Sequence, residues 1–443
     1  MRRHSEHVLL KQARIAELAK QTPAMGFYSL MHHLDMEWLM EAYWRTRKDG
    51  APGVDRQTWE AYGQELEGNL RRLIERLKAK RYRAPPVLRK YIPKGGKAGE
   101  YRPLGIPTLE DKVLQRAVVM LLEPIYAEDF SDDSYGFRTG RSPHQAVEAI
   151  WRQAMKIQGG WVLELDIRKF FDEVNHQHLR AFLKRRLRDG ALLRLIGKWL
   201  KAGVMEEGLI SYPEAGTPQG GVISPLLANI YLHYVLDEWY HTEVKPRLRG
   251  YTYLVRFADD AVLGFSDEAD ARRVLEVLPK RFARFELRLH PEKTRLIDFR
   301  KPRGEDKSPD GPGGEQHSFE MLGFNHYWAK SRKGKWVIKR KTASSRLARS
   351  IRAVHEWCKK YRHKPLAEQQ RALNRKLQGH CGYYGITGNS RSLNGYRYRL
   401  LCIWRYWLSR RNRKRLLTWE RFNRLLSHYP IRPARTVHSV CRA

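Results

Sequence analysis

Residues 251–265 read YTYLVRFADDAVLGF, and this stretch sets the expected fold of the region around it. Apolar residues stand on both sides of the Asp259-Asp260 pair, a pattern that predicts strand, tight turn and strand. Two adjacent carboxylates repel each other, and Asn-Gly or Asp-Gly would form a two-residue turn more easily. A bound cation would remove this penalty, although the pair alone is also compatible with an ordinary polar turn.

A second strand that carries a carboxylate is expected at residues 161–167 (WVLELDI). Its odd-numbered residues face one way, and its even-numbered residues, which include Asp166, face the other. If this strand lies beside the hairpin, Asp166 joins Asp259 and Asp260. Three such carboxylates can hold two divalent metal ions roughly 3.5–4 Å apart, which would activate an attacking hydroxyl and stabilise a leaving pyrophosphate.

The segments on either side extend this pattern. Short strands are expected near residues 295–299 and 319–324, with helical patterns between the strands, which suits a ferredoxin-like βαββαβ sheet with helices on one face. Residues 84–110 hold Pro and Gly between short β-prone stretches and predict a basic hairpin. Residues 300–318 are rich in Gly, Pro and charge and predict an exposed loop.

Both ends of the chain have helical periodicity. One face of a helix within residues 1–80 carries Leu66, Leu70, Leu73 and Leu77. After about residue 340 the chain is helical and very basic, with an apolar stripe of Leu347, Ile351, Val354, Cys358 and Tyr361. The sequence therefore predicts an α+β fold with a helical extension at 1–80, a mixed region at 81–335 and a helical region at 336–443.

The charge balance indicates the kind of partner. The chain has 84 Lys and Arg against 48 Asp and Glu, a net charge of +36 that is spread from end to end. Such a field favours nucleic acid, because membrane-binding proteins usually carry their charge in one segment. No apolar run reaches about eighteen residues and no secretory segment is present, so we expect a cytoplasmic protein without a membrane partner.

Phe257-Ala258-Asp259-Asp260 resembles the Tyr-x-Asp-Asp signature of reverse transcriptases, with Phe in place of Tyr. Other blocks resemble that family in the same order and spacing. They are YIPKGGKAGEYRPLGIPTLEDKVLQ (91–115) and SDDSYGFRTGRSPHQAV (131–147) in the fingers, LELDIRKFFDEVNH (163–176) for metal binding, GTPQGGVISPLLANIYLHYVLD (216–237) for template and nucleotide positioning, and LHPEKTRLIDF (289–299) and FEMLGFNH (319–326) in the palm.

The turn APGVD (51–55) and the segment LNRKLQGHCGYYGITGNS (373–390) resemble the reverse transcriptase–maturases encoded by group II introns. The resemblance implies a right-hand polymerase, with fingers and a ferredoxin-like palm at 81–335 and an all-α thumb/maturase domain at 336–443. It implies an enzyme that copies intron RNA into DNA and assists splicing and mobility. The implied partners are group II intron RNA, a DNA target and primer, and deoxynucleoside triphosphates.

Residue roles follow from this resemblance. The catalytic residues are Asp166, Asp259 and Asp260, and together with Ile167 they are expected to bind two Mg²⁺ ions, for which Mn²⁺ can substitute. The expected nucleotide-binding residues are Lys94, Arg102, Phe170, Phe171, Gln219, Gly220 and Gly221. Phe170 or Phe171 should lie under the incoming sugar and exclude a 2′-hydroxyl, and core packing fits the other. Lys293 and Arg138 should contact template or primer. Arg349, Arg352, Lys376 and Arg391 should contact intron RNA.

Two alternatives share these blocks. One is a splicing cofactor whose polymerase is vestigial, against which the three aspartates argue. The other is a free-standing or domesticated reverse transcriptase that acts in phage defence or repair. The family often adds a zinc-containing HNH nuclease after the thumb. Here the scattered Cys358, Cys381, Cys402 and Cys441 form no CxxC pair, so cleavage of a second DNA strand is not expected.

Overall fold

The 251–265 stretch forms a β-hairpin, as its pattern predicts. Strand β6 (Thr252–Phe257) pairs antiparallel with β7 (Asp260–Phe265). Strand β3 (Trp161–Asp166) lies on the other side of β7, and β8 (Arg295–Asp298) completes an antiparallel sheet in the order β6-β7-β3-β8. Helices connect β3 to β6 and β7 to β8, so this is the strand order of the predicted βαββαβ sheet.

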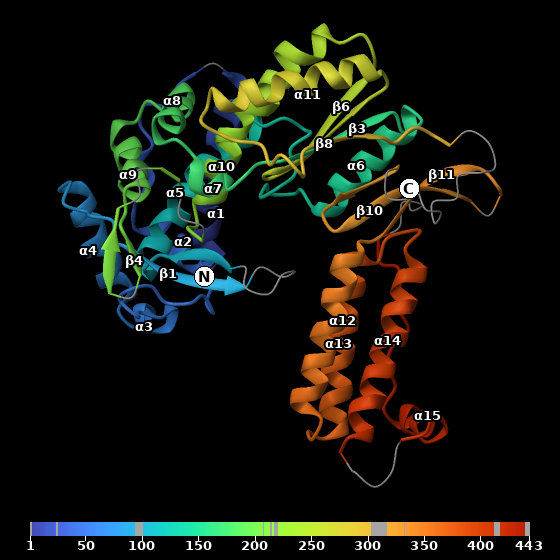
Figure 1. The fold of residues 1–443 in the computed structure, drawn as a ribbon. Helices are drawn as coiled ribbons and strands as arrows, with labels where there is room; N and C mark the ends of the chain where they lie inside the picture. Colours follow the sequence, from blue (N-terminus) through green and yellow to red (C-terminus); the bar gives the residue numbers. More distant parts are fainter. Residues whose placement is uncertain are drawn as a thin grey trace.

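The chain folds into a mixed α/β part and a helical bundle that projects from it (Figure 1). The computed structural model describes residues 2–23, 25–93, 101–206, 208–212, 215–216, 220–302, 317–331, 333–411 and 417–438. Within these ranges no helix is both long and apolar enough to cross a lipid bilayer. The predicted fold class, helices and strands mixed and then helices alone, is confirmed at this level.

Helices cover both faces of the central sheet, so the prediction of helices on one face was wrong. Helices α10 (Ser224–Leu232) and α11 (Glu268–Ala283) share an apolar core with Leu163 on one face. Helix α6 (Pro143–Lys156) shares a second core with Val162 on the other face. Both strand residues are fully buried. Neighbouring residues of β3 are apolar, and a strand buried on both faces has no alternating pattern.

The N-terminal region is helical, as predicted. It consists of α1 (Arg2–Gln21), η1 (Met31–His33), α2 (Met36–Arg45), α3 (Trp59–Gln64) and α4 (Leu66–Lys78). Leu70 and Leu73 are fully buried, and the other two leucines of the repeat pack against the same core. Helix α5 (Leu109–Asp129) packs against α1 and α2 and joins this region to the rest of the mixed part.

The predicted basic hairpin is confirmed and belongs to a larger sheet. Strand β1 (Val87–Pro93) pairs antiparallel with β2 (Tyr101–Ile106). It also pairs in parallel with β4 (Val204–Glu206), which pairs with β5 (Leu209–Ser211). The sequence did not predict these two three-residue strands, because they are too short to show a period.

Further helical segments lie between β3 and β4 and between α10 and β6. They are α7 (Phe170–Glu173), α8 (His176–Arg186), α9 (Gly190–Leu200), η2 (His233–Asp237), η3 (Tyr240–Val244) and η4 (Lys245–Arg247). Segments η2 and η3 are π-helical, and η2 continues directly from α10. Such turns are rare and are frequent at functional sites.

A third sheet lies between the mixed part and the bundle. Strand β10 (Phe324–Lys330) pairs with β9 (Ser318–Met321) and with β11 (Trp336–Thr342). Because residues 336–342 belong to this sheet, the helical region begins at Ser344 and not at the predicted boundary at 336. Most of the predicted loop at 300–318 lies outside the described residues.

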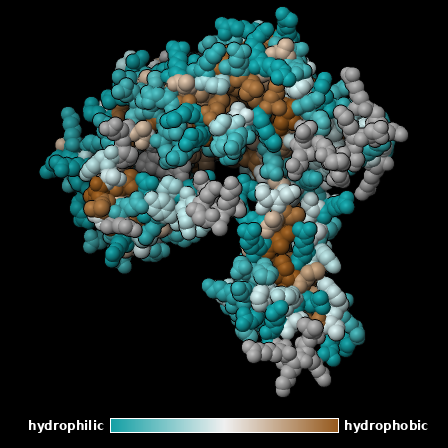
Figure 2. Space-filling view, viewed as in Figure 1, coloured by the Kyte–Doolittle hydropathy of each residue, from teal (hydrophilic) through white to brown (hydrophobic). Residues whose placement is uncertain are grey.

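The C-terminal bundle consists of α12 (Ser344–Tyr361), α13 (Leu366–Tyr384), α14 (Ser390–Ser409) and α15 (Trp419–His428). Val354 and Cys358, from the predicted apolar stripe, are buried in its core with Trp404. Figure 2 shows hydrophobic side chains in the furrow between α12 and α14, with hydrophilic surface on both sides. The same view shows a hollow between the part that carries the β1–β2 hairpin and the bundle.

Candidate active site

A two-residue turn carries Asp259. Phe257 and Asp260 are register partners at the ends of β6 and β7, so Ala258 and Asp259 alone connect the strands. The φ angle of Ala258 is +56°, a left-handed conformation that costs a residue with a Cβ of order 1 kcal/mol. Gly136 packs directly on this turn, because a Cβ built there would lie 2.3 Å from the Ala258 nitrogen.

The strand register brings the third carboxylate to the turn. Asp166 is the last residue of β3 and is the register partner of Asp260 on β7. Asp166, Asp260 and Glu164 line one pocket of about 500 Å³ between the sheet, the β9–β10 hairpin and the start of α12. The three aspartates predicted from the sequence therefore lie together at one edge of the central sheet.

The charged forms of the Asp259 and Asp260 carboxyl groups are unfavourable in their surroundings. Desolvation by the surrounding protein, followed by the negative charges of Asp259 and Asp166, raises the pKa of Asp260 to about 6. Desolvation is also the main cause that raises the pKa of Asp259, with a further contribution from Asp166. Like charges held this close favour the protonated forms. A cation placed among them would favour the ionised forms, so the donor set suits a hard, oxygen-binding metal ion.

A lysine ammonium stands beside one of these carboxylates. Lys293 Nζ donates to Asp166 Oδ2 over 2.9 Å. As the side chains stand, no three His, Cys, Asp or Glu groups among the described residues converge closely enough to hold a metal ion. Oxygen ligands of the required kind are present, and one of them, Asp166, is paired with Lys293. The predicted contact of Lys293 with template or primer stays a prediction, and in this structure Lys293 contacts Asp166.

Two arginines complete the electrostatic surroundings. Arg346, at the start of α12, lines the same pocket and lowers the pKa of Asp260. Arg102, exposed on β2, lowers the pKa of Asp259, so the basic hairpin lies close to the carboxylates. Sequence reasoning named Arg102 but missed Arg346, which lies 86 residues after Asp260 and is set apart by no motif.

The paired phenylalanines have different surroundings. Phe170 is 2% exposed, lies in the main core and packs edge-to-face on Tyr231. Phe171 is half-buried, and its ring centroid lies 5.4 Å from that of Phe170. Core packing therefore explains Phe170, and Phe171 is the ring with a partly free surface.

The remaining predicted nucleotide-binding residues are partly outside the described structure. Lys94 and Gln219 lie outside the described residues. Gly220 has a φ of +115°, and a Cβ built on it would lie 2.7 Å from the Gly105 carbonyl on β2. Gly221, the next residue, is buried and lines a small cavity together with Gln115 and Trp199. A side chain at Gly220 would therefore clash with β2 of the basic hairpin.

Arg138 makes structural contacts within the protein, and its predicted contact with template or primer stays a prediction. Its guanidinium donates to the backbone carbonyls of Ser131, Ser134 and Ala127, at 2.5, 2.9 and 3.3 Å. It also lies over the ring of Phe130. These contacts brace the loop between α5 and α6, which packs against the Ala258-Asp259 turn.

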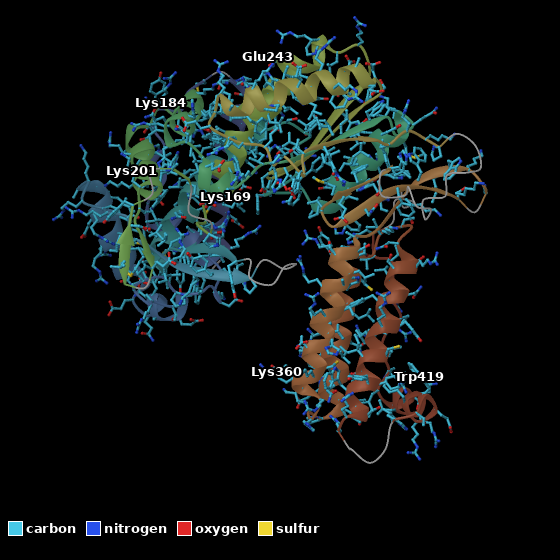
Figure 3. The ribbon with its side chains drawn as sticks, in the orientation of Figure 1. Lys169, Lys184, Lys201, Glu243, Lys360 and Trp419 are labelled. Atoms are coloured by element: carbon cyan, nitrogen blue, oxygen red, sulfur yellow. The ribbon has the colours of Figure 1, made fainter. Side chains whose placement is uncertain are left out.

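The predicted RNA-binding residues lie on the projecting bundle. Arg349 and Arg352 are exposed on α12, and Arg391 is exposed at the start of α14. Lys376 is half-buried on α13, with its ammonium over the ring of Trp357. Basic side chains also extend from the mixed part. Figure 3 labels three of them, Lys169, Lys184 and Lys201, together with Lys360 on the bundle, and all four are exposed.

Known proteins share sequence with this chain. Residues 92–326, more than half of the chain, match the family described as reverse transcriptase (RNA-dependent DNA polymerase). Protein YkfC of Escherichia coli (strain K12) is 39% identical over 237 residues, which cover 52% of this chain and 61% of that protein. Group II intron-encoded protein LtrA of Lactococcus lactis subsp. cremoris is 44% identical over 169 residues, 38% of this chain and 27% of LtrA.

A relative from a plant is, like LtrA, named for an intron. Nuclear intron maturase 4, mitochondrial, of Arabidopsis thaliana is 28% identical over 148 residues, which cover 33% of this chain and 18% of that protein. The chain spans less than two thirds of the length of each of these three relatives. The matched family region, residues 92–326, contains Asp166, Asp259 and Asp260.

Proposed function

The chain belongs to the reverse transcriptase (RNA-dependent DNA polymerase) family, and we propose that it is the RNA-directed DNA polymerase of a group II intron. One observation carries the proposal of activity. Asp166 and Asp260 are register partners on adjacent strands, and Asp259 occupies the turn between β6 and β7. The test is extension of a DNA primer on an RNA template, which should require all three aspartates.

We assign the catalytic roles to this chain's own residues. The carboxylates of Asp166, Asp259 and Asp260, with the backbone of Ile167, would hold two Mg²⁺ ions, and Mn²⁺ can substitute. When bound, such ions supply Lewis acidity that activates the primer hydroxyl and stabilises the leaving pyrophosphate. Arg102 lies near Asp259 and would bind the triphosphate of the incoming nucleotide.

We assign the fingers, palm and thumb of a right-hand polymerase to elements of this structure. In this proposal the fingers comprise the N-terminal helices and the β2-β1-β4-β5 sheet, and the palm comprises the β6-β7-β3-β8 sheet. The thumb is the bundle of α12, α13 and α14 (Figure 1). A primer–template duplex would then lie in the hollow between hairpin and bundle, with its primer end at the carboxylates.

Phe171 is the better candidate for the residue that excludes ribonucleotides. Replacing Phe171 with Val should open space beneath the sugar and raise the preference for UTP over dTTP by at least about tenfold, because such packing differences are worth ~1–3 kcal/mol. Single-nucleotide incorporation kinetics with each nucleotide would measure this ratio.

Phe170→Ala is the matched control for this prediction. It removes a buried ring, which should destabilise the fold by ~3–5 kcal/mol without a specific change in the nucleotide ratio. A Phe171→Val protein with the wild-type ratio would place sugar selection elsewhere.

Lys293 should compete with metal ions for Asp166. An ion pair this exposed is worth up to ~1 kcal/mol, so Lys293→Ala should bind Mn²⁺ up to about fivefold more tightly. Titration of Mn²⁺ followed by electron paramagnetic resonance would measure the affinity, with Lys301→Ala as the control for a lost surface charge. Unchanged or weaker binding would show that Lys293 does not compete for this carboxylate.

We propose a second role in splicing and mobility of the intron RNA. The names of the relatives LtrA and nuclear intron maturase 4 support it, as do the exposed arginines on α12 and α14. A free-standing reverse transcriptase remains the competing account of the same carboxylates. A group II ribozyme sequence around the reading frame would favour the intron-encoded enzyme, and its absence would favour the free-standing one.

A further inference from the structure

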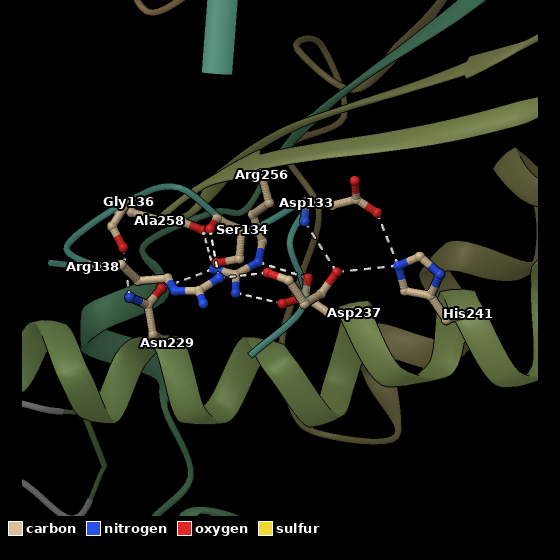
Figure 4. A network of polar contacts seen from close by, with 10 residues as sticks. Asp133, Ser134, Gly136, Arg138, Asn229, Asp237, His241, Arg256 and Ala258 are labelled. Carbon is tan, nitrogen blue, oxygen red and sulfur yellow. Dashed lines mark hydrogen bonds and ion pairs between the residues drawn. The ribbon is translucent and has the colours of Figure 1, made fainter. Parts of the chain in front are cut away.

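A buried guanidinium lies directly behind the Ala258-Asp259 turn. Arg256, on β6, has no exposed surface. Its Nε and Nη2 donate to the two oxygens of Asp237 at 2.8 and 2.5 Å. Its Nη1 donates to Asn229 Oδ1 and to the Ala258 carbonyl oxygen, both at 3.0 Å (Figure 4). One side chain therefore connects the turn to two positions on the long helix that begins with α10.

The partners of Arg256 are buried and held in place. Asp237 and Asn229 are each 1% exposed, and Asp237 ends the π-helical segment η2. Asn229 also donates to the Gly136 carbonyl over 2.6 Å, and Gly136 packs against the backbone of Ala258. The backbone of Arg256 exchanges two hydrogen bonds of 2.8 Å with the 133–135 segment of the same loop. The network thus contacts the turn at the Ala258 carbonyl and near the Ala258 nitrogen.

The turn needs this support because its conformation is unfavourable. Ala258 has a positive φ, and such a residue persists only where its surroundings over-determine it. The bond from Nη1 fixes the Ala258 carbonyl and with it the peptide plane that leads into Asp259. We propose that Arg256 is a positioning residue that holds the Asp259 carboxylate in the orientation needed for metal binding and catalysis. This inference rests on the proposed function.

A purely structural role for the ion pair is separable from this positioning role. A buried ion pair can often be replaced by apolar residues of similar volume without loss of stability, whereas removal of one partner leaves a costly unpaired charge. Apolar side chains can fill the space of Arg256 and Asp237, but they cannot donate a hydrogen bond to the Ala258 carbonyl. Stability and positioning should therefore respond differently to a paired apolar substitution.

The test compares two double variants of the full chain. The first combines Arg256→Met with Asp237→Leu. The matched control combines Arg186→Met with Asp129→Leu, which removes a second buried pair, with 3.0 Å between Nε and Oδ2 and side chains 3% and 12% exposed. Arg186 instead joins α8 to the carbonyls of residues 19, 22 and 23, so the control reports the general effect of losing a buried pair.

Three readouts apply to each variant: the Tm, the Mn²⁺ affinity from electron paramagnetic resonance, and the rate and nucleotide affinity of single-nucleotide incorporation. For the Arg256 double variant we expect a Tm close to that of the Arg186 control, because both variants lose a buried ion pair and leave buried acceptors without a donor. The incorporation rate should be about 100-fold lower than that of the control, because displacing a reacting group by ~1 Å has that effect. The Mn²⁺ affinity should fall by ~10-fold or more, as it does when groups that orient ligands are lost. The nucleotide affinity should change little.

The outcomes separate the alternatives. An Arg256 double variant that keeps the wild-type incorporation rate and Mn²⁺ affinity, or that loses no more than the Arg186 control, would overturn the positioning role. If that double variant does not fold, Arg256→Lys replaces it, because it keeps the charge but loses the fork that reaches both Asp237 and Ala258. An inactive wild-type protein would instead overturn the proposed function, and the Mn²⁺ titration would still test the positioning of the turn.

Discussion

Replacing Asp259 with Ala should reduce template-directed DNA synthesis by at least about 1,000-fold. The substitution removes a carboxylate from the two-metal site, and such sites supply several kcal/mol of transition-state stabilisation, with each 1.36 kcal/mol worth a factor of ten. Asp260→Ala should have an effect of the same size. The measurement is single-nucleotide primer extension on an RNA template under saturating Mg²⁺.

Both variants should remain folded and should bind RNA. The negative charge of Asp259 raises the pKa of Asp260, so removal of either charge relieves repulsion and should not lower the Tm. Asp298→Ala is the matched control, because Asp298 is a carboxylate on β8 of the same sheet, opposite Trp161 at the far end of β3. Primer extension by Asp259→Ala at a rate near that of wild type would refute the assignment of the metal site.

Replacing Arg349 and Arg352 together with Glu should weaken binding to the native intron RNA by at least about tenfold, or ~1.4 kcal/mol. Both side chains are exposed on α12, and the exchange reverses two charges on a surface proposed to contact folded RNA. Primer extension on a simple template should be affected less. Lys359→Glu with Lys360→Glu is the matched control, because it makes the same change of charge near the other end of α12.

Salt titrations distinguish specific binding from charge attraction. Binding through charge alone releases counterions, and its affinity falls steeply and equally for any RNA as salt rises. Contacts that depend on the shape of the RNA and on stacking with its bases persist at higher salt. The native intron RNA should therefore stay bound at salt concentrations that release an unrelated structured RNA of equal length. If both RNAs bind equally at every salt concentration, and the double variant loses binding and extension together, then the bundle acts only as a thumb.

The sequence predicted best where one local pattern determines the structure. The hairpin around Asp259-Asp260 and the leucine repeat in α4 both form as expected. In each case a two-residue turn or a single periodicity is enough to specify the element. The sequence predicted that Asp166 joins the pair only if its strand lies beside the hairpin, and the register between Asp166 and Asp260 is known from the structure alone.

Other features depend on tertiary contacts that leave little trace in the sequence. Helix α6 covers the second face of the central sheet. The sequence signal for this was the run of consecutive apolar residues Tyr253-Leu254-Val255, which are buried alternately in the two cores. Arg256 follows directly, and a charged residue inside an apolar strand is itself a signal for a buried ion pair. No local pattern indicated that Arg346 would approach Asp260 or that Phe170 and Phe171 would differ in burial.

The most direct test of the central claim is extension of a labelled DNA primer annealed to an RNA template by the wild-type protein. With Mg²⁺ and all four deoxynucleoside triphosphates, we expect full-length complementary DNA. Omission of one nucleotide should stop synthesis at the first template position that requires it, and removal of Mg²⁺ with a chelator should abolish synthesis. Absence of extension, extension that ignores the template, or preferential use of ribonucleotides would contradict the account.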